Sequence, residues 1–88
     1  MHKLNTEGMY NSLNLAEMIK NRAKHKQIAL TDMLSDLNLG SNTMSNMRHG
    51  SMISADSLAR IADYLDCSVD YLLGRTEDPN AHKSDGKP

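Results

Sequence analysis

The chain has 88 residues, the size of a single small domain that buries only about 60% of its unfolded surface. It has seven Met, no Phe or Trp, and one cysteine, Cys67, which excludes an intrachain disulfide and a cysteine-based zinc site. No apolar stretch suits a signal peptide or a membrane span, so we expect a cytoplasmic protein with no membrane association. Cys67 itself is expected to be a small buried apolar residue.

Charge is unevenly distributed along the chain, although the net charge is only −1. Residues 13–50 carry five basic and three acidic side chains, whereas residues 51–88 carry four basic and seven acidic side chains. The mildly basic first half could contact phosphates, but so small an excess predicts weak non-specific affinity for nucleic acid.

The first helix is preceded by a segment without apolar periodicity, residues 1–12, which we expect to be a flexible arm. Asn14 and Glu17 have the spacing of a capping box, which predicts a helix from Asn14 to about Lys26. Its apolar stripe is formed by Leu15, Ile19 and Ala23. Lys20, Lys24 and Lys26 lie off this stripe. They could contact phosphates, although cations near a helix end also complement the helix macrodipole.

A helix-turn-helix is predicted next. The second helix should cover residues 28–37, where apolar side chains recur at i, i+4, and its N-cap is either Ala29 or Thr31. Asn38 and Gly40 tolerate the positive φ that a chain needs to leave a helix. The third helix should start at residue 41 or 42 and run to Arg48.

The third helix has two different faces. At about 100° of rotation per residue, Met44 and Met47 share one side, which should face the core. The opposite side carries small polar groups: Asn42, Ser45, Asn46 and His49. Such a face is typical of a solvated surface helix or of a helix that reads base edges in the major groove of DNA, and we favour the second interpretation.

Two further helices are expected in the second half of the chain, with Ser54 and Ser68 as their N-caps. The fourth helix has the cleanest amphipathic pattern, formed by Leu58, Ile61, Ala62 and Leu65. The fifth helix is short and should end at Gly74. We therefore expect an all-α domain over residues 13–76, followed by a disordered polar tail over residues 77–88.

Residues 54–65 and 68–75 resemble the last two helices of the Cro/CI-type helix-turn-helix family, also called the XRE family. Residues 40–47 are similar to the recognition helix of this family, especially that of phage-like regulators of the Gram-positive type. The resemblance implies a five-helix, lambda-repressor-like bundle with its helix-turn-helix at helices 2 and 3. It also implies a sequence-specific transcriptional regulator, expected to be a repressor, that binds double-stranded DNA as a homodimer.

The resemblance assigns roles to residues by their position. Base contacts are implied for Ser41, Asn42, Thr43, Ser45 and Asn46. Phosphate contacts are expected from His49 and Arg48, together with the lysines of the first helix, Lys20, Lys24 and Lys26. Dimer contacts are expected from the fifth helix and its exit, at Tyr71, Leu72 and Arg75.

Several positions depart from the family pattern and lower the expected capacity for phosphate binding. Leu30 stands where many members have a glutamine that binds phosphate, and Ser41 stands where a basic residue is frequent. Arg22 replaces an apolar residue, Ala29 replaces a serine cap, and Ile53 replaces a proline. A helix-turn-helix scaffold that binds another protein, as an antirepressor or antitoxin-like module, is therefore the alternative function.

Catalysis is not expected, because neither His25 nor His49 has a nucleophile or carboxylate partner at a suitable spacing. The sequence contains no glycine-rich phosphate loop and no cluster of metal-ligating residues. We therefore expect no cofactor, no metal and no small-molecule ligand.

Overall fold

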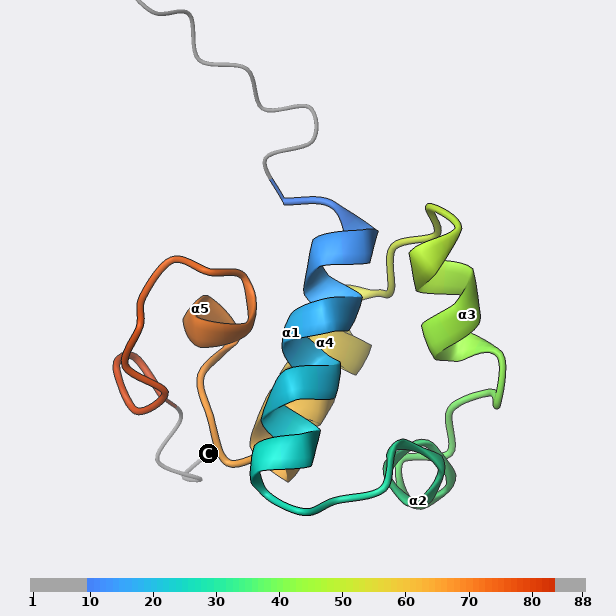
Figure 1. Cartoon of the computed structure of the whole chain (residues 1–88), viewed down its shortest axis with the longest axis horizontal. Helices are drawn as coiled ribbons and strands as arrows, with labels where there is room; N and C mark the ends of the chain where they lie inside the picture. Colours follow the sequence, from blue (N-terminus) through green and yellow to red (C-terminus); the bar gives the residue numbers. More distant parts are fainter. Residues whose placement is uncertain (1–9, 84–88) are drawn as a thin grey trace, which may run out of the picture.

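The computed structural model describes residues 10–83, and within this range the chain forms five α-helices and no strand (Figure 1). The helices are α1 (Ser12–His25), α2 (Leu30–Asp36), α3 (Thr43–Arg48), α4 (Ala55–Tyr64) and α5 (Val69–Leu72). The predicted all-α, five-helix fold is therefore confirmed. α1 packs against α3 and α5, which lie on opposite sides of it, and α5 also packs against α4. None of the helices in this range combines the length and apolar character needed to span a membrane.

α1 begins earlier than predicted, because its N-cap is Asn11 and not Asn14. The Oδ1 atom of Asn11 accepts a hydrogen bond of 2.7 Å from the backbone N–H of Asn14. The predicted capping box was wrong because the sequence has two asparagines one turn apart, and the earlier one starts the helix. Glu17 consequently lies in the second turn of α1, where it caps nothing. Residues 1–9 of the predicted arm lie outside the described residues.

All five helices end in the same way. A residue with φ between 58° and 105° follows each helix, namely Gln27, Asn38, Gly50, Asp66 or Gly74. The next N–H then bonds to the carbonyl five residues earlier, as from Ile28 to Ala23 at 2.8 Å. This pattern is the Schellman motif. It confirms the helix end predicted at Asn38, whereas Gly40 does not adopt a positive φ.

The motif that ends α1 also explains why α2 is shorter than predicted. Ile28 belongs to the end of α1, and α2 runs only from Leu30 to Asp36. Its N-cap is Ala29, which has an extended backbone and makes no side-chain capping bond. α3 likewise starts later than expected, at Thr43. The predicted N-caps Ser54 and Ser68 are confirmed, since their hydroxyls accept hydrogen bonds from the N–H groups of Ser57 and Tyr71.

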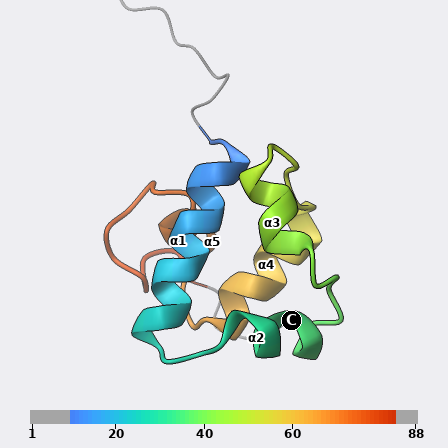
Figure 2. The same ribbon diagram turned by 45° about the vertical axis from the view of Figure 1, so that its right-hand side comes forward.

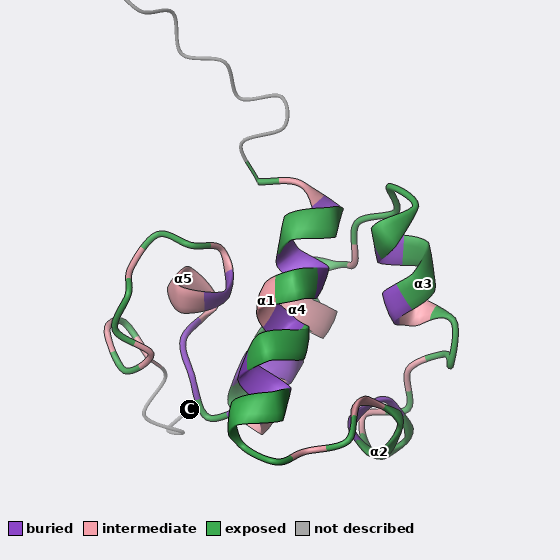
Figure 3. Ribbon diagram, in the orientation of Figure 1, coloured by how far each residue is buried: buried purple, intermediate pink, exposed green. Residues whose placement is uncertain are grey.

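The core is a single cluster of aliphatic side chains and methionines, visible as the inward purple stripes of the ribbon in Figure 3. The predicted apolar stripes of α1, α3 and α4 all contribute to it. Cys67 is 1% exposed, as predicted, and burial raises the pKa of its thiol. The buried apolar residues are Leu15, Ala16, Ile19, Ala23, Met33, Leu34, Met44, Met47, Ile61, Ala62, Leu65, Cys67 and Leu72.

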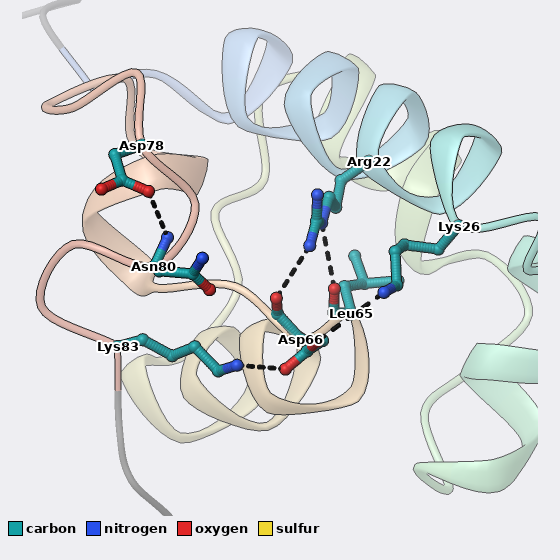
Figure 4. A network of polar contacts seen from close by, with 7 residues as sticks. All are labelled: Arg22, Lys26, Leu65, Asp66, Asp78, Asn80 and Lys83. Carbon is teal, nitrogen blue, oxygen red and sulfur yellow. Dashed lines mark hydrogen bonds and ion pairs between the residues drawn. The ribbon is translucent and has the colours of Figure 1, made fainter.

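Arg22 is a buried charged residue on the inner side of α1. Its Nε atom donates to the carbonyl of Leu65 at 3.0 Å and its Nη2 atom donates to the carbonyl of Asp66 at 2.8 Å (Figure 4). Both carbonyls lie at the end of α4, where a helix leaves acceptors unpaired. The guanidinium also lies 5.8 Å from the centre of the Tyr71 ring. An arginine can therefore replace the apolar residue of the family pattern because it closes α4.

The segment after α5 lies against the loop that joins α4 to α5. The N–H of Ser68 donates to the carbonyl of Pro79 at 2.9 Å, and Lys83 forms an ion pair with Asp66 (Figure 4). The hydrogen bond and charge of Lys83 hold the pKa of Asp66 below its usual range. These contacts belong to residues 77–83 of the predicted tail, while residues 84–88 lie outside the described residues. The proposed division into arm, domain and tail remains a prediction.

Candidate nucleic-acid interface

The two faces predicted for α3 are present in the structure. Met44 and Met47 are 6% and 0% exposed and fix the helix to the core. The opposite side of the helix is exposed and lies at the edge of the molecule (Figures 2 and 3). α3 is therefore a short helix with an apolar anchor and a polar outer surface.

The five residues predicted to contact bases differ in exposure and in the hydrogen bonds of their side chains. Ser41, Asn42, Ser45 and Asn46 are exposed, and their side chains make no hydrogen bond to another described residue. Thr43 is half-buried, and its hydroxyl donates to the carbonyl of Gly40 at 2.6 Å. Thr43 therefore stabilises the turn before α3, and the four exposed side chains are the better candidates for reading bases.

His49 follows α3 directly and has a fixed orientation. Its Nδ1 atom lies 2.8 Å from the carbonyl oxygen of Ser45. Because a carbonyl can only accept, Nδ1 must carry the proton in this contact. Nε2 is then the ring nitrogen that can meet an external group.

Arg48, in the last turn of α3, is paired with an acid that sequence reasoning assigned to another role. Its Nε atom lies 3.5 Å from Oε2 of Glu17, and the two side chains are 36% and 49% exposed. The pair joins α3 to α1 across the outer surface. The spacing of the two residues along the sequence carries no signal that would have revealed it.

The fold separates Lys26, the C-cap of α1, from Lys20 and Lys24 within α1. Lys20 and Lys24 lie within about 60° of rotation of Glu17, and therefore on the side of α1 from which Glu17 reaches α3. Lys26 lies about 180° from Glu17 by the same rotation. It forms an ion pair of 3.6 Å with Asp66 (Figure 4). The structure thus separates Lys26 from the other candidate phosphate contacts.

Most cations in the described part of the chain are already paired. Of its eight Lys and Arg side chains, five form ion pairs and Arg22 is buried. Lys20 and Lys24 remain without a partner among the described residues. The pairs are Lys26–Asp66, Arg48–Glu17, Arg60–Asp56, Arg75–Asp70 and Lys83–Asp66. Sequence reasoning underestimated this neutralisation because counts of charge do not record pairing.

The polar surface of α3 continues onto α2, which sequence reasoning missed. A surface pocket of about 320 Å³ lies between α2 and the start of α3. Its lining is Thr31, Leu34, Ser35, Asn38, Leu39 and Ser41. Two exposed polar residues of α2, Thr31 and Ser35, are spaced i, i+4. This spacing could have suggested a second exposed polar stripe.

The predicted dimer contacts need one correction. Leu72 is 0% exposed and belongs to the core, so its side chain offers no surface to a second subunit. Tyr71 is half-buried. Arg75 is exposed but engaged within the chain, with an ion pair of 3.1 Å to Asp70 and a hydrogen bond of 3.0 Å to the Tyr10 hydroxyl.

Two consecutive short helices, the second with a buried side and an exposed polar side, define a helix-turn-helix protein. A family model for the Cro/C1-type HTH DNA-binding domain matches residues 18–78, and the chain belongs to this family. The chain accordingly carries a DNA-binding domain of the type found in transcriptional regulators. Searches among curated proteins and among solved structures gave no match.

Proposed function

We propose that this chain is a sequence-specific transcriptional repressor that places α3 in the major groove of double-stranded DNA. The observation that supports the proposal is the exposed face of α3, where Asn42, Ser45 and Asn46 stand opposite two buried methionines. A bidentate contact from an asparagine to adenine contributes about 1–3 kcal/mol of discrimination. A helix with this surface is suited to reading bases.

Phosphate contacts in this proposal come mainly from Lys20 and Lys24 on α1. Nε2 of His49 can donate to a phosphate only in the imidazolium form, in which both ring nitrogens carry a proton. Arg48 contributes when its pair with Glu17 opens. Because few cations among the described residues are free, we expect non-specific affinity to be weak and most of the binding free energy to come from base contacts.

Selection from a random-sequence duplex library at low salt should enrich one operator. On that operator, Asn46→Ala is expected to lower discrimination at a single base pair by about 1–3 kcal/mol. Lys24→Ala should weaken binding to all sequences equally and reduce the magnitude of the salt slope by about 0.9. Fluorescence anisotropy against salt measures both effects. Failure to enrich any sequence would refute sequence-specific binding.

We further propose that the repressor binds as a homodimer through the surface around Tyr71 and Arg75. A symmetric operator would then have half-sites about 34 Å apart, one turn of the duplex. Sedimentation of the complex should give two chains per operator, and Tyr71→Asp should give one chain with weaker binding. A single chain bound at full affinity to an asymmetric site would argue against the dimer.

A protein-interaction module is the second candidate function, and the extensive pairing of cations within the chain favours it. In this case the exposed polar surfaces of α2 and α3 would contact a protein instead of a duplex. The two functions are distinguished by adding nuclease to a pull-down: a stoichiometric protein partner retained after digestion supports the module, and loss of the bound material supports the repressor.

A further inference from the structure

We infer that Glu17 competes with DNA phosphate for Arg48 and thereby sets the affinity of the protein for DNA. The inference rests on the proposed function, since it concerns how the same surface binds a duplex. It assigns a role in recognition to a residue of α1 that does not itself contact the nucleic acid.

The position of the pair supports this role. Arg48 lies at the end of α3, next to the exposed polar face and directly before His49. Its Nε atom is 3.5 Å from a carboxylate oxygen of Glu17, and its guanidinium makes no hydrogen bond or ion pair with any other described residue. A carboxylate and a phosphate both present anionic oxygens to a guanidinium, so each can replace the other as its partner.

The exposure of the pair makes such an exchange feasible. Both side chains are partly in water, at 36% and 49% exposure, and an exposed ion pair changes an equilibrium constant by at most about fivefold. A phosphate can therefore open the pair at small cost. Once it has opened, the unpaired Glu17 carboxylate lies near a group of the same charge, which lowers the affinity further.

The alternative is that Glu17 only stabilises the fold, but the contacts around it do not require such a role. Met44 and Met47 already fix α3 to the core. Asn11, and not Glu17, caps α1. Removing the carboxylate should therefore leave the fold intact while freeing Arg48.

The test is Glu17→Gln, measured by anisotropy on the selected operator and on an unrelated duplex. We expect it to bind both duplexes about two- to fivefold more tightly than the wild type. The salt slope should steepen by up to about 0.9, since one more cation becomes available to the phosphates. Circular dichroism should show unchanged helix content.

Two controls separate release of Arg48 from a general change of charge. Glu77→Gln makes the same chemical change at an exposed residue beyond α5. The segment that follows α5 lies on the opposite side of α1 from α3 (Figure 1). Glu77→Gln should change neither the affinity nor the salt slope by a comparable amount. In an Arg48→Gln background, Glu17→Gln should give no further gain.

The possible results are distinguishable. If the wild type binds its operator and Glu17→Gln binds it equally or more weakly, this inference is overturned and the proposed function stands. An equal gain from Glu77→Gln, or a gain that persists without Arg48, also overturns it. If neither the wild type nor Glu17→Gln binds any duplex at low salt, the proposed function fails and the inference fails with it.

Discussion

Replacing Met47 with alanine is expected to lower the free energy of unfolding by about 2–5 kcal/mol. Met47 is 0% exposed and is one of two buried residues that fix α3 to the rest of the bundle. The substitution removes buried apolar surface and leaves a cavity beneath the candidate recognition helix. Chemical denaturation followed by circular dichroism measures the loss.

Met52→Ala is the matched control for this prediction. Met52 follows α3 in the chain but is 48% exposed, so the same chemical change should alter stability by no more than about 0.5 kcal/mol. Equal losses in the two variants would mean that Met47 does not anchor α3. DNA binding by Met47→Ala, measured below its unfolding temperature, should also weaken, because a loosened α3 no longer presents its polar face in one orientation.

Replacing Arg22 with methionine is expected to lower the free energy of unfolding by about 2–3 kcal/mol. Methionine keeps much of the side-chain volume but leaves the carbonyls of Leu65 and Asp66 without their donor. The hydrogen bond to the Leu65 carbonyl is buried and the one to the Asp66 carbonyl is partly buried, and unpaired polar groups are costly where water is excluded. Thermal and chemical unfolding measure the effect.

Arg75→Met provides the comparison for Arg22. Arg75 is 54% exposed and its main partner is the half-buried carboxylate of Asp70, so its loss should cost less than about 1 kcal/mol. Arg22→Lys should fall between the two, since one ammonium group cannot reproduce the two-pronged geometry of a guanidinium. A neutral or stabilising Arg22→Met would show that water replaces the arginine at the end of α4.

The fold was largely predictable because its helices carry strong periodic signals. The methionines of α3 and the apolar stripe of α4 define which sides are buried, and Gly50 and Gly74 indicate helix ends. The positive φ of Gln27 and Asp66 was not predicted, because these residue types adopt positive φ much less often than glycine. The start of α1 was missed because two asparagines offered equivalent caps.

The candidate site was less predictable than the fold. Periodicity identified the outward face of α3, but it could not show that Thr43 is turned toward Gly40 or that Leu72 lies in the core. The pair between Glu17 and Arg48 joins different helices and has no local pattern. Ion pairs that form only after folding cannot be predicted from composition. In this chain they determine how many cations remain available to bind phosphate.

The Schellman motif that ends each helix also affects the free energy of binding. The turn between α2 and α3 is closed by hydrogen bonds from Asn38 and Leu39 back to α2, and by the Thr43 hydroxyl on Gly40. The candidate recognition surface is thus preorganised by local contacts. In the proposed complex, little conformational entropy would be lost when α3 docks, so a modest set of contacts would be enough for a stable complex.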